Sequence, residues 1–282
     1  MADFQGEKAY VAQGDVYHDD GREIRLLHYL YSRPDLAQIR GSPAKVLAAI
    51  DHYGRTVEYL MNVGEHKGQI VTRLIVETKP QVMVELGGYV GYSAILFGHA
   101  LQKAGGRQYL SLERNAEFGA VASSLIDLAG LGSVVKVVYG ACQESLRRLH
   151  SEGTLKRLDM LFLDHYKPAY LPDLKLCEQL ALIQPGTLLV ADNVVKPGNP
   201  PYLEYVRSSV QAKKKGMATP SGSQSFDKKW VDMYEKRQGV EKLDTELQGD
   251  PCLVYTSELV ESFEPTGAPD GVEITRCVRR ES

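Results

Sequence analysis

The sequence has little of what would mark a specialised class of protein. Its four cysteines, Cys142, Cys177, Cys252 and Cys277, form no CxxC pair, so we predict reduced thiols and no disulfide framework or zinc site. It lacks an apolar run long enough to cross a membrane and an N-terminal signal core, so we predict a cytoplasmic protein with no membrane partner. A net charge of −3 lacks the basic excess of proteins built to bind nucleic acid, which argues against that class.

What is present describes an ordinary globular protein. Hydrophobic residues make up 43% of the 282 positions and charged residues 24%, which is enough for one large α/β core. Residues 1–21 are polar and aperiodic, so we predict a loosely held, flexible tail before a single domain over 22–282. Residues 213–250 are predicted to be a surface insertion, in which the lysine run 213–215 is a solvated helix end. We expect a monomer or a weak oligomer.

Strand and helix patterns alternate along most of the chain. Helical spacing covers 22–39, 42–60 and 65–78, and after Pro80 apolar strand-like runs alternate with helical segments. The runs lie at 81–87, 107–114, 134–140, 158–163 and 187–193. This order predicts right-handed βαβ units and an α/β fold with a parallel sheet covered on both faces. Two later β-rich runs, 252–263 and 271–278, flank a Pro- and Gly-rich turn, which predicts a C-terminal antiparallel hairpin.

Oxygen-bearing side chains follow two of the predicted strands. Asp164 ends the run at 158–163, and Asp192 and Asn193 end the run at 187–193. If the two strands are neighbours, these side chains meet at the carboxyl edge of the sheet and suit Mg²⁺. The alternative is that they cap the following helices. Lys167 lies three residues after Asp164, where a nearby cation disfavours its ammonium form and suits it to act as a general base.

The first strand ends in a glycine-bearing turn, VELGGYVGYSA. Its glycines lack the GxGxxG spacing of a dinucleotide site, and the next strand ends at Glu113, where a carboxylate can hold ribose hydroxyls. We therefore favour a nucleoside site over a simple tight turn with an exposed glutamate. His165 is expected to pack against the cofactor, and Cys142, at the start of a helix, to line the cofactor site or the core.

Several motifs together resemble a known family. MNVGEHKGQI, VELGGYVGYSA, LDMLFLDHYKPAYLPD and LLVADNVVKPG are similar to successive motifs of the catechol O-methyltransferase family, from about Val46 to Arg207 and again in the C-terminal hairpin. The resemblance implies a Rossmann-like methyltransferase fold with a seven-stranded, mainly parallel sheet and extra N-terminal helices. It also implies Mg²⁺-dependent transfer of the methyl group of S-adenosyl-L-methionine to one hydroxyl of a small-molecule catechol.

The resemblance also assigns site residues one by one. It implies Asp164, Asp192 and Asn193 as metal ligands and Lys167 as general base. The implied cofactor-binding residues are Met61, Val63, Glu85, Gly87, Tyr89, Ser93, Glu113, Cys142, Gln143, Asp164, His165 and Tyr166. The implied substrate-binding residues are Tyr59, Lys167, Asn193, Pro197 and Glu261.

Some of these positions depart from the family pattern or rest on a choice of alignment. Cys142 stands where the family commonly has serine, and Tyr59 and Tyr166 stand where the mammalian enzymes have tryptophan. Glu261 is expected to hold the second catechol hydroxyl, and a rival alignment would choose Asp232. We prefer Glu261 because it leaves a strand, a turn and a second strand before the chain ends.

Other functions stay open at this point. The nearest is another metal-dependent O-methyltransferase, acting on caffeoyl thioesters or flavonoids. A nicotinamide-dependent oxidoreductase would share the alternation of strands and helices, but the glycine spacing counts against it. A binding protein that kept the fold without activity is disfavoured by the complete set of metal, base and nucleoside residues.

Overall fold

The computed structural model describes residues 4–216, 228–240 and 242–282, and within these ranges one seven-stranded sheet organises the chain. The strand order is β3-β2-β1-β4-β5-β7-β6. The strands are β1 (Val82–Leu86), β2 (Gln108–Glu113), β3 (Val135–Tyr139), β4 (Met160–Leu163), β5 (Leu188–Ala191), β6 (Leu253–Phe263) and β7 (Pro269–Arg280). The first five pair in parallel, and β7 runs antiparallel to both β5 and β6. The predicted sheet and hairpin are confirmed.

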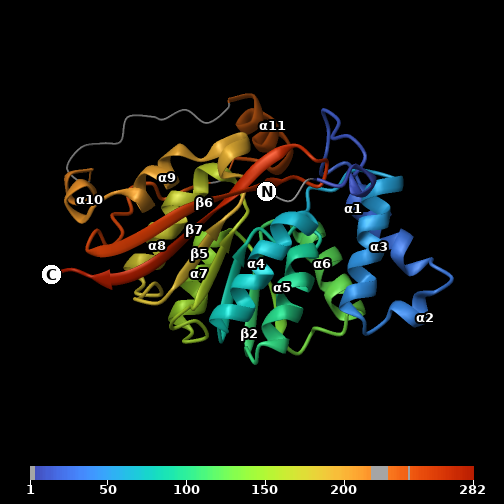
Figure 1. Cartoon of the computed structure of the whole chain (residues 1–282), viewed down its shortest axis with the longest axis horizontal. Coiled ribbons are helices and arrows are strands. Elements are labelled where there is room, and N and C mark those ends of the chain that lie inside the picture. Colours follow the sequence, from blue (N-terminus) through green and yellow to red (C-terminus); the bar gives the residue numbers. More distant parts are fainter. Residues whose placement is uncertain (1–3, 217–227, 241) are drawn as a thin grey trace.

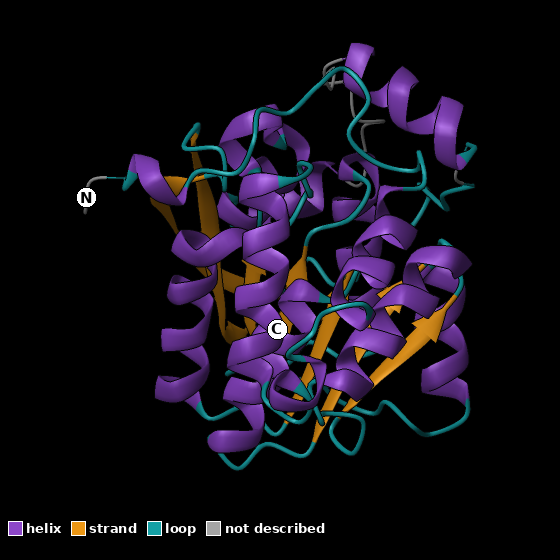
Figure 2. Cartoon of the chain, turned by 90° about the vertical axis from the view of Figure 1, so that its right-hand side faces the viewer, coloured by secondary structure: helices purple, strands orange, loops and turns teal. Residues whose placement is uncertain are grey.

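Helices cover both faces of the sheet (Figures 1 and 2). Alternate side chains of each central strand enter two separate apolar clusters, as β4 shows: Met160 and Phe162 belong to one, Leu161 and Leu163 to the other. The first cluster also takes residues from α1 (Arg22–Tyr31), α3 (Pro43–Thr56), α4 (Gly64–Thr78), α5 (Tyr92–Lys103) and α6 (Ala116–Leu128). The second takes residues from α7 (Cys142–Ser151), α8 (Tyr170–Gln179) and α9 (Pro200–Arg207). Burial on both faces explains the nearly continuous apolar composition of β4 and β5.

Shorter helical segments complete the described chain. They are η1 (Gly6–Lys8), α2 (Leu36–Ile39), η2 (Lys167–Ala169), η3 (Val194–Gly198), α10 (Val210–Gly216) and α11 (Lys228–Gln238). No helix of the described ranges has both the length and the apolar character that a membrane span requires. All four cysteines are free, and Cys142, Cys177 and Cys277 are buried, in keeping with the predicted thiols.

The topology fixes where a ligand can bind. From β1 the chain proceeds to β2 and β3 on one side, and β4 and β5 lie on the other side. The order therefore reverses between β1 and β4, and in open α/β sheets the crevice beyond the carboxyl ends of such strands is the usual ligand site. The residues after β1, β4 and β5 are the glycine turn, Asp164 and the pair Asp192–Asn193.

The N-terminal segment differs from the expectation of a loosely held tail. Residues 4–21 run over the carboxyl edge of the sheet towards α11, in dark blue in Figure 1. Tyr10 is only 5% exposed, packs its ring on Gly54 and donates a hydrogen bond from its hydroxyl to Asp51 Oδ1 at 2.6 Å. Periodicity did not reveal this contact because an extended segment can be held by a few anchoring side chains.

The predicted surface insertion at 213–250 also needs correction where it is described; residues 217–227 and 241 lie outside the described ranges. Lys213 is not solvated: it is 4% exposed, donates a hydrogen bond to the Leu253 carbonyl and lies over the rings of Tyr205 and Tyr255. Its ammonium group therefore lies against two aromatic faces and one backbone carbonyl. Helix α11 packs at the edge of the ligand crevice.

Candidate active site

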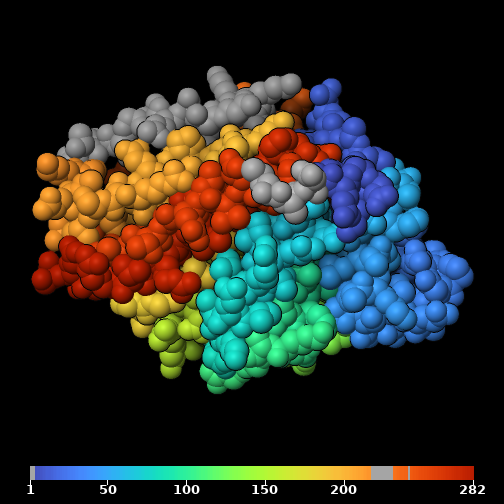
Figure 3. Space-filling view, in the orientation of Figure 1, coloured from blue at the N-terminus to red at the C-terminus, as the bar shows by residue number. Residues whose placement is uncertain are grey.

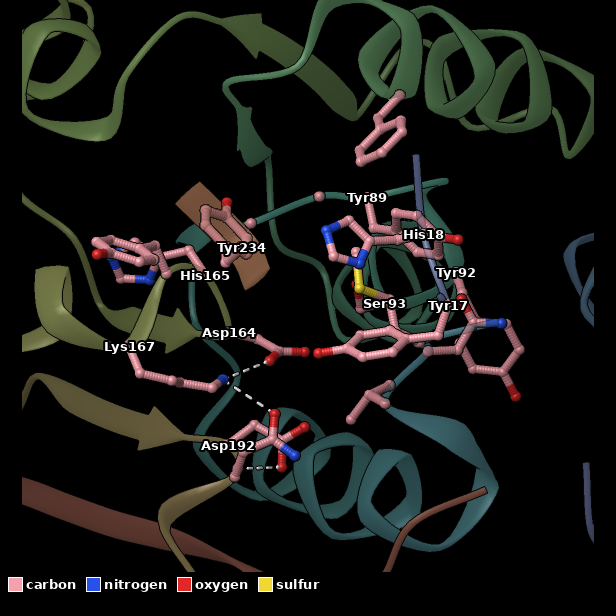
Figure 4. Close-up of a pocket in the computed structure, with 18 of the residues that line it drawn as sticks. Tyr17, His18, Tyr89, Tyr92, Ser93, Asp164, His165, Lys167, Asp192 and Tyr234 are labelled. Atoms are coloured by element: carbon pink, nitrogen blue, oxygen red, sulfur yellow. Dashed lines mark hydrogen bonds and ion pairs between the residues drawn. The ribbon is translucent and has the colours of Figure 1, made fainter. Parts of the chain in front are cut away.

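A cavity of about 330 Å³ lies at the carboxyl edge of the sheet. It is lined by the residues after β1, β2, β4 and β5, by the β6–β7 turn, by α11 and by three residues of the N-terminal segment, Gln13, Tyr17 and His18 (Figure 4). A space of this size, with a few polar groups among aromatic side chains, is typical of a small-molecule site.

The two acidic strand ends lie side by side. Leu163 of β4 pairs with Ala191 of β5, and the Asp192 amide donates to the Leu163 carbonyl at 2.9 Å. Asp164 and Asp192 are therefore at the same level of neighbouring strands, as predicted. Asn193 comes next with a φ of 56°, a left-handed conformation that asparagine tolerates better than most residues.

Lys167 joins these side chains. Its Nζ donates to Asp164 Oδ1 at 3.1 Å and to Asn193 Oδ1 at 2.9 Å. A third hydrogen bond, of 2.6 Å, goes to the Tyr170 hydroxyl, and the side chain is only 5% exposed. An amine is thus fixed beside the acidic pair, within reach of a ligand that enters the cavity.

A second lysine lies beneath the acidic edge. Lys67 of α4 is completely buried, and its Nζ contacts Asp192 Oδ1 at 2.7 Å, Glu264 Oε1 at 2.7 Å and Asp270 Oδ2 at 2.9 Å. Burial raises the pKa of Asp192 to about 7 although Lys67 opposes that shift. Burial also raises the pKa of Glu264 to about 8, again against Lys67. No local sequence signal marks Lys67, because its partners Glu264 and Asp270 lie about two hundred residues away along the chain.

Glu261 does not reach this site, which corrects the prediction. It lies within β6 opposite Gly271, and its side chain is exposed. Asp232 of α11 is exposed and does not line the cavity either. The glutamate that does line the cavity is Glu264, whose Oε1 accepts a hydrogen bond from Asn193 Nδ2 at 2.6 Å.

The physical reason is the direction of the strand. Because β6 runs parallel to β5, its carboxyl end lies at the same edge of the sheet as Asp192. Glu264 comes directly after the last residue of β6, whereas Glu261 lies inside the strand. Asp164 and Asp192 were located because they follow a strand at the carboxyl edge of the sheet. Glu264 follows β6 at the same edge, so the same criterion selects it.

The glycine turn after β1 forms the nucleoside side of the cavity. Gly87 has a φ of +93°, and a side chain there would collide with the backbone of Asp164. Glu113 Oε2 accepts from the Gly88 and Tyr89 amides at 3.1 and 2.8 Å. Burial raises the pKa of Glu113 to about 7, against these amide hydrogen bonds. Glu113 thus shapes the turn as well as facing the cavity.

Most of the other predicted cofactor residues also line the cavity, and two do not. Those that do are Met61, Val63, Tyr89, Ser93, Cys142, His165 and Tyr166, together with the predicted substrate residues Tyr59 and Pro197. Glu85 is buried behind the turn, where it accepts from Ser111 Oγ at 2.6 Å. Gln143 is buried, and its Oε1 accepts from the Asp244 amide at 3.0 Å.

His165 is held rigidly on this side. Its ring stacks on Tyr170 with 4.8 Å between the centroids, and its Nε2 lies 3.0 Å from Asp173 Oδ2. Cys142, His165 and Asp173 bring ligand atoms within 4.8 Å of one another. His165 and Asp173 already form a hydrogen-bonded pair. We therefore interpret the cluster of Cys142, His165 and Asp173 as a set of contacts that orients the His165 ring.

Several residues that line the cavity were not predicted from the sequence. Tyr17 and His18 come from the predicted tail, and Tyr234 and Gln238 come from α11. Tyr234 stacks on Tyr166 with 4.8 Å between the centroids. These residues lie in segments with no strand or turn motif, so only their aromatic character within polar stretches could have suggested them.

Comparisons with known proteins agree with the geometry. Residues 48–215 match the O-methyltransferase family. Catechol O-methyltransferase of Bos taurus is 42% identical over 188 residues, 67% of this chain and 67% of the relative. Catechol O-methyltransferase of Mus musculus is 43% identical over 190 residues, 67% of this chain and 69% of the relative.

A solved structure supports the fold. The O-methyltransferase of Bacillus cereus in complex with SAH has a TM-score of 0.54 at 19% identity, covering 91% of this chain and 97% of that one. The resemblance drawn from the motifs and the predicted fold class are both confirmed. The matching motifs, the sheet order and the extent of the aligned sequence together show that this chain belongs to the O-methyltransferase family.

Proposed function

We propose that the protein transfers the methyl group of S-adenosyl-L-methionine to one hydroxyl of a catechol, with Mg²⁺ bound at the strand ends. The observation that carries this proposal is the position of Lys167, which lies within 3.1 Å of Asp164 and of Asn193 beside the glycine turn. The likeness to relatives named catechol O-methyltransferase supports the choice of substrate.

The donor set fits a hard divalent cation. Asp164 and Asp192 offer carboxylate oxygens and Asn193 an amide oxygen, all of which Mg²⁺ prefers to nitrogen or sulfur ligands. Each carboxylate uses its Oδ1 to contact a lysine. A bound cation would supply positive charge that favours the ionised form of a neighbouring hydroxyl.

Lys167 in its neutral amine form is proposed to accept the proton of the reacting hydroxyl and become the ammonium. As that O–H bond breaks, the oxygen forms a bond to the methyl carbon, and the carbon–sulfur bond breaks with its electron pair going to sulfur. The products are the methyl ether and S-adenosylhomocysteine. Lys167 is held by Tyr170 at 2.6 Å, and this fixed position contributes through proximity and orientation.

Glu264 is proposed to orient the second hydroxyl of the catechol. It faces the cavity next to Asn193, where it can accept a hydrogen bond from a hydroxyl adjacent to the reacting one. Tyr59 and Pro197 provide apolar walls for the ring. A vicinal diol can contact Lys167 and Glu264 together, whereas a single phenol can contact only one of these groups.

The test is a methyl-transfer assay over a panel of vicinal diols, single phenols, a caffeoyl thioester and flavonoids. We expect turnover of simple vicinal diols, its loss in EDTA and its recovery on adding Mg²⁺. Full activity in EDTA would refute the metal role, and a preference for the thioester or flavonoids would support the rival methyltransferase.

A separate calorimetric experiment tests the cofactor class. The protein should bind S-adenosylhomocysteine and should not bind NAD. Binding of NAD without binding of S-adenosylhomocysteine would support an oxidoreductase.

A further inference from the structure

Two segments outside the family match close over the cavity. Residues 13–18 precede the matched range 48–215, and α11 lies beyond its end. Both contribute lining residues: Gln13, Tyr17 and His18 from the first, Tyr234 and Gln238 from the second. We call these two segments the cap. The cap is therefore an addition to the part of the chain that carries the methyltransferase motifs.

The N-terminal side of the cap is anchored before it reaches the cavity. The Tyr10 amide donates to the Pro265 carbonyl at 2.9 Å, in the β6–β7 turn, and the Val11 amide donates to the Gly54 carbonyl at 2.9 Å. Figure 3 shows the dark-blue N-terminal residues packed beside the red C-terminal hairpin. Residues 13–18 thus begin their path over the cavity from a fixed point.

The other end of the segment is anchored as well. Arg22 is buried, and its guanidinium donates to the Val16 carbonyl at 2.9 Å and to the Tyr59 carbonyl at 2.8 Å. Arg237 of α11 donates from Nη1 to the carbonyls of His18 and Asp19 at 3.0 and 2.9 Å. The two halves of the cap are therefore joined directly to each other.

Helix α11 is joined to the cofactor side of the site. The Tyr166 hydroxyl donates to Glu235 Oε1 at 2.6 Å, in addition to the stacking of Tyr166 on Tyr234. Arg114, next to Glu113, donates from Nη2 to the Gln238 carbonyl at 2.8 Å. The helix is thus placed over the nucleoside end, between the residues after β2 and those after β4.

His18 is a buried polar group in the cap whose surroundings indicate a ligand. It is 1% exposed, and neither of its ring nitrogens has a hydrogen-bond partner among the described residues. Figure 4 shows its ring extending from the N-terminal segment into the cavity. Burial lowers the pKa of His18 to about 4, and Arg237 and Arg22 act in the same direction against Asp20. The ring is therefore neutral at physiological pH, with one donor and one acceptor nitrogen.

Neighbouring rings indicate which ligand His18 meets. Its centroid lies 5.8 Å from that of Tyr234, which stacks on Tyr166 on the nucleoside side. The adjacent Tyr17 instead contacts Tyr59, on the substrate side, at 6.2 Å. A buried polar group without a partner is costly, so a ligand carrying hydroxyl, amine or carboxylate groups would relieve that cost.

We propose that the cap retains the methyl donor, with the His18 ring hydrogen-bonding a polar group of bound S-adenosyl-L-methionine. This inference rests on the proposed function, since it takes the cofactor as the occupant of the nucleoside side. It assigns His18 a binding role and assigns Arg237 a positioning role, because Arg237 holds the backbone that presents the His18 ring.

The test measures cofactor binding without substrate. Calorimetry with S-adenosylhomocysteine is performed on the parent protein and on His18→Phe, which keeps an aromatic ring and removes both nitrogens. We expect Kd to rise about three- to tenfold, the loss of one hydrogen bond to a neutral partner. His18→Gln, which keeps a donor and an acceptor, should recover much of this affinity. His99→Phe, a histidine of α5 that does not line the cavity, is the matched control and should bind as the parent does.

A second variant keeps the proposal testable if His18→Phe does not fold. Arg237→Met leaves the His18 side chain intact but frees its backbone, so the dissociation rate of S-adenosylhomocysteine should increase while the KM for catechol changes little. Parent-like affinity in His18→Phe together with a parent-like dissociation rate in Arg237→Met would overturn the proposal. If the parent protein itself does not bind S-adenosylhomocysteine, the proposed function fails, which is a distinct result.

Discussion

Replacing Lys67 with methionine removes a fully buried ammonium while keeping most of the side-chain length. The ammonium contacts Asp192, Glu264 and Asp270 at 2.7–2.9 Å, so the variant leaves a cluster of buried carboxylates without their cation. Removing one partner of a buried ion pair typically costs about 3–5 kcal/mol, because the remaining charge stays desolvated. At about 2 °C per kcal/mol for a domain of this size, Tm should fall by about 6–10 °C.

The loss of stability in Lys67→Met should depend on pH, and the pKa shifts of the neighbouring carboxyl groups determine whether it grows or shrinks as pH rises. Even with Lys67 present, burial raises the pKa of Asp192 to about 7 and of Glu264 to about 8. A carboxyl whose folded pKa is raised stabilises the fold below its unfolded pKa and loses that contribution as pH rises through the folded value. Without Lys67 this shift becomes larger, so the variant should lose stability more steeply than the parent between pH 6 and pH 8.

Urea unfolding at pH 6 and pH 8, in EDTA so that no metal replaces the ammonium, measures both effects. Lys45→Met, at an exposed position of α3, controls for the loss of a lysine charge. Adding Asp270→Asn to Lys67→Met should recover part of the stability by removing one unpaired carboxylate. A Lys67→Met protein within about 1 kcal/mol of the parent at pH 8 would show that the cluster does not depend on this cation.

Three further outcomes are expected at the site. Lys167→Ala should lower kcat by about 10²–10⁴-fold and leave the Kd for S-adenosylhomocysteine within about threefold, and near-normal kcat would place the base elsewhere. Glu264→Gln should lower kcat/KM for catechol by about ten- to a hundredfold while Glu261→Gln has no effect; the opposite ranking would restore the sequence-based choice. Burial raises the pKa of Glu85 to about 7, so the stability that protonated Glu85 provides is complete below pH 4.5 and is lost as pH rises through 7. Glu85→Gln should remove that loss, which is worth about 3 kcal/mol. In thermal unfolding at pH 8 the variant should therefore be more stable than the parent. If the variant shows the same dependence of stability on pH as the parent, Glu85 does not have a raised pKa from burial.

The succession of strands along the chain and the residues at their ends could be predicted from sequence because both are local. A run such as 158–163 must be buried on both faces, and the residues directly after it must leave the sheet at the carboxyl edge. Asp164, Asp192, Asn193 and Lys167 were located in this way, and the structure brings them together. Glu264 obeys the same rule, and it was missed because Glu261 was chosen by alignment instead of by strand direction.

The contacts between distant parts of the chain were decided only by the tertiary structure. Lys67 meets Glu264 and Asp270 across about two hundred residues, and His18 meets Arg237 across a similar separation. No local period marks such residues, because their positions depend on how helices and loops pack over the sheet. The sequence by itself therefore determined the sheet and the reactive edge, whereas packing decided which buried cation supports that edge and which segments cover it.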